Sequence, residues 1–148
     1  MLVGKVRALY ADTDQMGVVN HVVALRWFEQ ARAEWLRRLG HSYRQMEAEG
    51  MMLPVYEVSV RYHKSARYDQ VVQLFASLRQ PGPVRVVFDY EIRCDQTAER
   101  LISGATHHAV VGADGKVRRL SPFVTELLKN GLDAERSAQT GDRAGCLG

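Results

Sequence analysis

The chain has 148 residues, of which 46% are hydrophobic and 25% are charged, as in an ordinary globular domain. This length suits about one domain, and the composition excludes collagen-like, low-complexity and fully disordered proteins. The apolar runs are far shorter than the ~20 residues of a membrane span, and the first residues lack the pattern of a signal peptide. We therefore expect a cytoplasmic protein with no membrane span.

The charge and the cysteines point to no particular macromolecular partner. Twenty Lys and Arg residues against 17 Asp and Glu residues give a net charge of +3, and the basic residues are scattered. No RNP, zinc-finger or P-loop pattern accompanies them, so we expect no nucleic-acid partner. The two cysteines, Cys94 and Cys146, follow no CxxC spacing, which argues against a disulfide framework and against a metal site.

The first predicted elements are a strand and a long helix. Residues 3–11 form an apolar-rich run that should end near Asp14, where turn-forming residues follow. A helix is then expected from Asn20, a good N-cap residue, to Gly40, a residue typical of the position after a helix. Its apolar face follows the helical spacing, and a broad face of this kind predicts a helix enclosed by other elements. The residues on it include Ala24, Phe28, Ala31, Trp35 and Leu39.

The middle of the chain changes from a helical period to a period of two. After a short helix over residues 43–49, apolar and polar residues alternate over 56–63, 72–78, 84–94 and, less regularly, 101–111. Four such strands joined by turns predict an antiparallel sheet with one buried face. The order of elements gives an α+β fold in which one long helix covers the sheet.

The C-terminal end is predicted to leave the folded domain. Ser121 and Pro122 favour the start of a short helix that ends after Leu128. The residues beyond it are small and polar, so 131–148 are expected to form a disordered tail. The folded domain is accordingly predicted to span residues 1–130.

The densest group of polar residues lies between the first strand and the long helix. It contains Asp12, Asp14, Gly17, Asn20 and His21. A helix N-terminus offers unpaired backbone N–H groups that can stabilise a developing oxyanion, and a nearby carboxylate can act as a base or a nucleophile. Acyl transfer needs both parts. The same residues also suit a turn in which the carboxylates only cap the backbone, so both interpretations stay open.

Two other motifs with paired aspartates fit poorly. An EF-hand that began at Asp12 would need an oxygen ligand at Met16 and a glutamate at Val23. A phosphatase of the haloacid-dehalogenase type would continue differently after the second aspartate, and it needs repeated strand–helix alternation that this chain lacks.

The motif Tyr-x-Asp-Thr-Asp14-x-x-Gly17-Val-Val-x-His21, followed by Leu-x-Trp-Phe-Glu29-x-Ala-Arg32, resembles the 4-hydroxybenzoyl-CoA thioesterase or YbgC-type acyl-CoA thioesterase family. The resemblance extends over roughly residues 3–130. It implies the hotdog fold of that family, in which a curved antiparallel sheet wraps around a central helix. It also implies hydrolysis of an acyl-CoA thioester to a free acid and coenzyme A.

The resemblance assigns expected roles to individual residues. Asp14 matches the catalytic carboxylate, a nucleophile or general base. His21 matches the position whose backbone N–H polarises the thioester carbonyl, and its side chain matches an assisting histidine. Gly17, Val19 and Asn20 would line the substrate side of the loop, although Asn20 stands where many members carry tyrosine.

The phosphates of coenzyme A should lie against basic residues. Lys64 and Arg85 are the candidates of choice, with Arg67 and Arg79 further along the predicted strand ends. A solvated sheet edge explains each of them equally well. No cofactor is expected, because coenzyme A is part of the substrate.

Two alternatives to a thioesterase remain open at this point. The chain could be a module that binds an acyl-CoA or an acyl-carrier-protein thioester without turnover, although a pure binder gains nothing from Asp14. A hotdog dehydratase is the other, but its resemblance would lie in a histidine paired with a distant carboxylate. The exposed sheet edge of a single hotdog unit predicts a homodimer or a homotetramer.

Overall fold

The computed structural model describes the backbone of residues 1–40 and 43–145, with the side chains of all of these except 43, 45 and 140–145. The strands are β1 (Leu2–Arg7), β2 (Val55–Tyr62), β3 (Val71–Leu78), β4 (Arg85–Cys94) and β5 (Arg100–Ala109). The helices are α1 (Val23–Arg37), α2 (Tyr43–Ala48) and α3 (Pro122–Gly145), with a 3-10 turn at Tyr10–Asp12.

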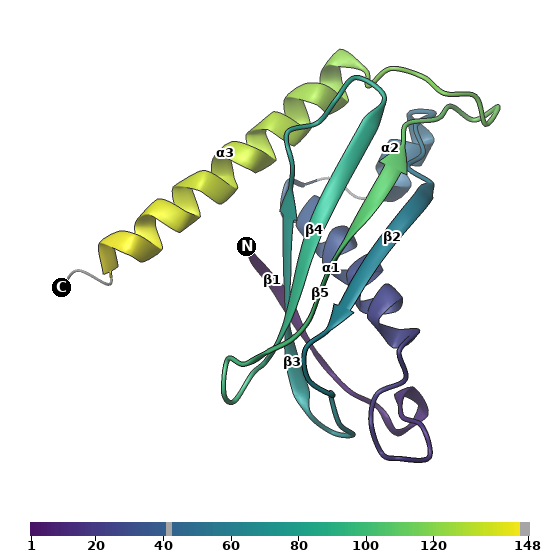
Figure 1. The fold of residues 1–148 in the computed structure, drawn as a ribbon. Helices are drawn as coiled ribbons and strands as arrows, with labels where there is room; N and C mark the ends of the chain where they lie inside the picture. The colour runs from purple at the N-terminus through teal and green to yellow at the C-terminus, as the bar shows by residue number, and fades with distance from the viewer. Residues whose placement is uncertain (41–42, 146–148) are drawn as a thin grey trace.

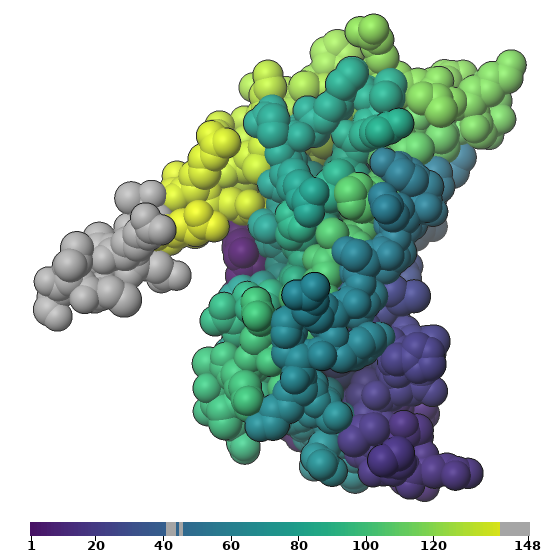
Figure 2. Space-filling model, in the orientation of Figure 1, coloured from purple at the N-terminus to yellow at the C-terminus, as the bar shows by residue number. Residues whose placement is uncertain are grey.

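The five strands form one antiparallel sheet in the order β1-β3-β4-β5-β2. Helix α1 lies behind this sheet and runs along its concave face (Figure 1). The opposite face of β2, β4 and β5 lies at the surface (Figure 2). The predicted α+β architecture, with a sheet wrapped around one long helix, is confirmed.

Helix α1 is enclosed because its apolar face is made of large aromatic and small residues. Trp27, Phe28 and Trp35 are each at most 1% exposed. The Phe28 ring stacks on Tyr90 of β4 at 4.5 Å, and Trp35 meets Phe88 edge to face at 5.4 Å. Such ring pairs add to the stability gained from burial alone.

Gly104 in β5 permits the close approach of α1 to the sheet. A Cβ atom at this position would lie 2.2 Å from the carbonyl oxygen of Ser59 and 2.8 Å from the ring of Phe28. Neither the paired strand nor a fully buried ring can move far. A side chain at residue 104 would therefore push the helix away from the sheet.

The start of α1 differs slightly from the prediction. The helix begins at Val23, and Asn20 lies in the turn that precedes it. The Asn20 side-chain oxygen accepts the backbone N–H of Val22 at 3.1 Å, and its carbonyl accepts that of Val23 at 3.0 Å. Asn20 thus still accepts hydrogen bonds from backbone N–H groups at the start of α1, as an N-cap residue does.

Strand β2 differs from β3 and β4, because residues on both of its faces are exposed. In β3 and β4 buried residues alternate with half-buried ones, as expected for a sheet with one covered face. In β2 the apolar residues Val55, Tyr56, Val58 and Tyr62 are 41–52% exposed. The strand lies at the sheet edge, where its second side has no partner strand within the described chain.

Helix α3 continues far beyond Leu128, so the predicted short helix and the start of the tail at residue 131 are corrected. Gly131, which suggested a helix end, lies inside the helix. Glycine is needed there for packing, because a Cβ atom would lie 2.4 Å from the Trp35 ring. Leu132 and Glu135 are also buried. Contacts with α1 and β3 therefore include residues 131–135 in the folded domain, and the helix continues to Gly145 (Figure 1).

No helix among the described residues is long and apolar enough to cross a bilayer.

Candidate active site

The loop between β1 and α1 is a small, closed turn. Thr13 and Val19 form an antiparallel bridge, and the Asp14 N–H donates to the carbonyl of Val18 at 2.9 Å. Gly17 has a φ of +75°, a conformation that side chains other than glycine rarely adopt. The loop therefore holds Asp14 near its tip by backbone geometry.

The first aspartate of the pair builds the loop. Asp12 is 2% exposed, and its carboxylate accepts the backbone N–H of Leu9 at 2.8 Å. The same carboxylate forms an ion pair with Arg26 of α1. The Asp12 carbonyl accepts the N–H of Asn20 at 2.8 Å. Asp12 is thus fully used in joining the loop to the helix.

The second aspartate is exposed and makes few contacts. Asp14 is exposed, and one of its carboxylate oxygens accepts the Met16 N–H at 2.8 Å. Among the described residues, the other oxygen has no protein partner. This carboxylate can therefore approach a ligand or a water molecule.

The peptide of His21 lies between the loop and α1. Its carbonyl accepts the hydroxyl of Tyr62, the last residue of β2. Burial raises the pKa of Tyr62, so its hydroxyl keeps its proton and can donate. The backbone N–H of His21 donates to no acceptor among the residues that the structure describes. The N–H groups of Val22 and Val23, by contrast, both donate to Asn20. An unpaired N–H at a helix N-terminus can bind a carbonyl oxygen that gains negative charge.

A cavity of about 270 Å³ lies beside this peptide. Four predicted site residues line it together: Val19, Asn20, His21 and Lys64. The other lining residues are Tyr62, His63, Ser65, Ala66 and Ile102. They come from the end of β2 and from β5, and a backbone hydrogen bond of 2.7 Å from Val19 to Ala66 joins this segment to the loop.

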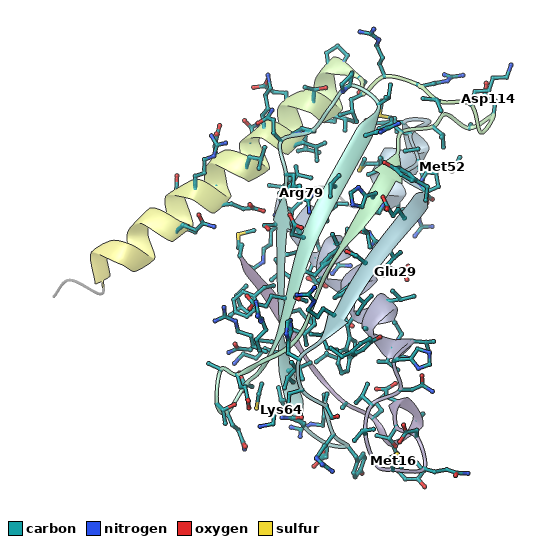
Figure 3. The ribbon with its side chains drawn as sticks, in the orientation of Figure 1. Met16, Glu29, Met52, Lys64, Arg79 and Asp114 are labelled. Carbon is teal, nitrogen blue, oxygen red and sulfur yellow. The ribbon has the colours of Figure 1, made fainter. Side chains whose placement is uncertain are left out.

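Asp14 and Gly17 lie outside the lining of this cavity but in the loop that borders it. The loop tip at Met16 and Lys64 lie at the same end of the molecule in Figure 3. Val18 forms an isolated bridge with Arg67, which brings the loop against the segment that follows β2. The Lys64 ammonium group pairs with Glu99 at 2.9 Å and is largely exposed.

Of the other basic candidates, Arg67 lies against the loop through its bridge with Val18, whereas Arg85 and Arg79 lie elsewhere. Arg85 begins β4 opposite Ala109, with its guanidinium group 5.9 Å from the Tyr56 ring, so it is not part of the cavity of its own chain. Arg79 donates two hydrogen bonds of 2.7 Å to Asp89. That pairing raises the pKa of Arg79 and satisfies its charge within the sheet.

Tyr62 and His63 also line the cavity beside His21, although no sequence motif identified them. Both belong to an alternating strand pattern, which predicts which face they occupy but not which loop they meet. His63 bonds to the Ser103 hydroxyl at 2.8 Å across the strand pair. The pairing of β2 with β5 puts Tyr62 opposite Ile102, and the hydrogen bond from Tyr62 to the His21 carbonyl puts this strand end beside the start of α1.

A second, larger cavity of about 590 Å³ lies further along α1. Apolar residues of the segment before β2 and the segment after β5 form much of its wall, with Glu29 and Arg32 of α1 and Glu47 of α2 as the charged residues. The lining also includes Met52, Leu53, Pro54, Val111 and Gly115. In Figure 3, Glu29 lies between Met52 and the end of the molecule that carries Met16 and Lys64.

Comparison with known proteins agrees with this architecture. The profile of the thioesterase-like superfamily matches residues 9–131. The chain is 36% identical to the Synechocystis protein sll0410 over 125 residues, which cover 83% of this chain and 75% of that one. It is 32% identical to the acyl-CoA thioester hydrolase YbgC of Escherichia coli over 87 residues, which cover 59% and 65% of the two chains.

Among solved structures, the Thermus thermophilus protein TT1821 superposes with a TM-score of 0.82 and 29% identity, over 87% of this chain and 98% of that one. The family match includes the loop with Asp14, the whole of α1 and all strands after it. The chain therefore belongs to the thioesterase-like superfamily and has its hotdog fold.

Proposed function

We propose that this protein hydrolyses acyl-CoA thioesters, releasing a carboxylic acid and coenzyme A. Membership of the thioesterase-like superfamily supports the class of reaction. The observation that carries the proposal is the unpaired His21 N–H at the start of α1, next to a cavity and to a loop whose exposed carboxylate, Asp14, is free to react.

In the proposed reaction the thioester carbonyl oxygen accepts a hydrogen bond from the His21 N–H. Asp14 then attacks the carbonyl carbon to form a mixed anhydride, which a water molecule later hydrolyses to free the acid and restore the carboxylate, or it removes a proton from a water molecule that attacks the carbonyl directly. Negative charge develops on the carbonyl oxygen, and the N–H stabilises it more strongly than it stabilises the neutral substrate. The carbon–sulfur bond breaks, the sulfur leaves with a proton as the thiol, and water supplies the hydroxyl group of the acid.

Tyr62 and the His21 side chain would support this step in different ways. The Tyr62 hydroxyl donates to the His21 carbonyl, which anchors the peptide between His21 and Val22 and so holds the His21 backbone beside the cavity. His21 is exposed and lines the cavity, and we assign its side chain to assist at the leaving sulfur. Val19 and Asn20 form the adjoining wall, and Gly17 keeps the turn compact.

We assign Lys64 to the phosphates of coenzyme A. It lines the cavity from the segment that follows β2, and its side chain is largely exposed. A phosphate would compete with Glu99 for the ammonium group, and an exposed ion pair of this kind contributes little to stability. Lys64 can thus exchange one anionic partner for another.

We also propose that the protein forms a homodimer, which can pair further into a tetramer. β2 offers an open strand edge with exposed Val58 and Tyr56, and exposed edges of this kind pair readily with another strand. Antiparallel pairing of two β2 strands would bring the Val55 end of one strand beside the Tyr62 end of the other. Arg85 of the partner subunit, which lies near the Val55 end of its sheet, would then approach the end of the sheet that carries the cavity beside His21.

The first experiment follows thiol release from a panel of short-chain, long-chain and aromatic acyl-CoAs, together with binding of a non-hydrolysable thioether analogue. The proposal predicts turnover of at least one substrate class. Tight binding of the analogue without thiol release from any substrate would instead support the binding module.

A further inference from the structure

A chain of buried hydrogen bonds crosses the core between α1 and the segment that precedes β2. Arg32 donates to the Tyr90 hydroxyl at 3.0 Å, and that hydroxyl lies 2.7 Å from the Thr106 hydroxyl. The Thr106 oxygen is 2.8 Å from Nε2 of His108, and Nδ1 of His108 is 2.8 Å from the carbonyl oxygen of Leu53. All four side chains are at most 8% exposed.

The protons of this chain have a single arrangement. A carbonyl only accepts, so Nδ1 of His108 carries a proton and donates it to Leu53. Burial lowers the pKa of His108 to about 4, so the ring is neutral at pH 7 and its Nε2 must accept from Thr106. Thr106 has one proton, so it must in turn accept from Tyr90. Every donor therefore points from Arg32 towards Leu53.

Both ends of the chain line the cavity of about 590 Å³. Arg32 lies on the α1 side and Leu53 on the opposite wall. Neighbouring backbone bonds hold the same wall: Met52 and Val111 exchange bonds of 2.9 and 3.0 Å, and Ala109 donates to Pro54 at 3.2 Å. The buried chain adds a link between this wall and α1 that passes through side chains of β4 and β5.

The larger cavity lies further along α1 than the His21 peptide. Arg32 lies nine residues after Val23, which corresponds to about 14 Å along the helix axis at ~1.5 Å per residue. Strand β2 runs beside the helix in the opposite sense, because Tyr62 meets His21 and Pro54 lies at the larger cavity. An acyl group whose carbonyl lies at His21 can thus extend towards this cavity.

We propose that Tyr90, Thr106 and His108 are positioning residues that set acyl-chain selectivity. They hold the Leu53 wall and Arg32 at a fixed separation, so that the larger cavity accepts the distal, apolar part of an extended acyl group. The inference rests on the proposed function. None of the three residues lines the cavity beside His21, so the chemistry at the thioester does not depend on them directly.

The test compares binding of two non-hydrolysable thioethers, S-ethyl-CoA and S-decyl-CoA. The wild-type protein is expected to bind the decyl compound at least tenfold more tightly. Thr106→Val removes the hydroxyl with little change of shape and should abolish most of that preference, with ethyl binding unchanged within about twofold. Thr106→Ser retains the hydroxyl and should restore the preference.

Two further variants separate positioning from general stability. Ile92→Val creates a small defect in the same buried sheet outside the chain of hydrogen bonds, and it should leave the preference unchanged. If Thr106→Val does not fold, Tyr90→Phe interrupts the same chain while its ring can still stack on Phe28, with the same expected loss.

Three results would overturn the inference: no decyl preference in the wild-type protein, equal weakening of both compounds in Thr106→Val or its substitute, or a Thr106→Ser variant that behaves like Thr106→Val. These are binding measurements, so they stand apart from the proposed function, which fails only if no acyl-CoA is hydrolysed.

Discussion

The two aspartates of the loop differ in what surrounds their carboxylates. Asp12 is buried, pairs with the exposed Arg26 and accepts a backbone N–H, so its removal would leave the Leu9 amide without its acceptor and Arg26 without its ion-pair partner. Asp14 is exposed and accepts one N–H from its own turn. Loss of Asp12 should therefore act on the fold of the loop, whereas loss of Asp14 should act on chemistry.

Lys64 provides a test of how the coenzyme is held. Lys64→Met retains the apolar stem and removes the charge, so KM for an acyl-CoA should rise by roughly fivefold with little change in kcat. The matching acyl-pantetheine, which lacks the nucleotide phosphates, should be hydrolysed equally by both proteins. Lys5→Met serves as the control. Like Lys64, Lys5 is an exposed lysine that forms an ion pair with a carboxylate, here Asp95 at 2.9 Å. An equal rise of KM for acyl-pantetheine would contradict the assignment.

His108 predicts a pH dependence of stability. Burial lowers its pKa to about 4, below the ordinary value of 6.5, so between these values the unfolded state binds more protons than the folded state. Stability is then complete above about pH 6.5 and falls as the pH drops towards 4. Between pH 7 and pH 5 this residue alone should lower the free energy of unfolding by about 2 kcal/mol.

The measurement is urea unfolding at pH 7 and at pH 5, at one protein concentration. His108→Gln should show a fall smaller by about that amount, whereas His107→Gln, on the half-exposed neighbour, should behave as the wild type. An identical fall in all three proteins would show that His108 is charged in the folded state.

At this scale the sequence allowed part of the site to be predicted. Asp14 and His21 lie in one continuous segment, so a motif could identify them together. Tyr62 and His63 are some forty residues further along the chain, and their place beside His21 depends on sheet pairing. Arg85, a strand-end candidate for binding the phosphates of coenzyme A, lies at the opposite end of the sheet from the loop. The alternation of a strand does not indicate which of its ends faces the loop.

At the scale of the elements, Gly131 decides how α3 packs on α1. Alanine favours a helix by about 1 kcal/mol over glycine, but its Cβ would lie 2.4 Å from the fully buried Trp35 ring. Overpacking of this kind costs about 1–3 kcal/mol. Gly131→Ala should therefore lower the melting temperature by several degrees. Asn130→Ala, at the exposed position just before it, should raise it slightly, and a rise in both variants would contradict this packing.

The same glycine explains why the length of α3 could not be predicted. Glycine followed by small polar residues usually ends a helix, and local propensity alone supports an end after Leu128. Packing against Trp35 overrides that preference, and Glu135 adds hydrogen bonds from the Trp35 indole and the Leu78 amide. By contrast, α1, β3 and β4 have strong periodic patterns, and their existence and type could be predicted from the sequence.

At the scale of the whole molecule, the open β2 edge supports assembly of two chains. Val58→Lys introduces a charge at a position that is 41% exposed in one chain, so a monomer should tolerate it. In a dimer joined through β2 the same charge would be buried. Sedimentation should show that the Val58→Lys variant is monomeric. Its rate of thiol release should be greatly reduced. Val117→Lys, at an exposed position outside β2, should retain the assembly of the wild type, and an unchanged assembly of Val58→Lys would place the interface elsewhere.

The overall architecture was the most predictable level. One strand, one enclosed helix and four strands with a period of two allow few arrangements, and the family motif selects the hotdog fold among them. The exposure of β2 was not predictable, since its alternation resembles that of a strand with one face buried. An alternating pattern predicts that the apolar residues are buried. It does not indicate whether the same chain or a second chain buries them.

The central claim is that Asp14 performs the chemistry of thioester hydrolysis. The most direct test is the rate of thiol release under saturating acyl-CoA by the wild type, Asp14→Asn and Asp69→Asn, the last removing another exposed loop aspartate. We expect kcat to fall by about 10²–10⁴-fold in Asp14→Asn, with analogue binding retained, and to stay near the wild-type value in Asp69→Asn. An Asp14→Asn variant that releases thiol at the wild-type rate would contradict the account.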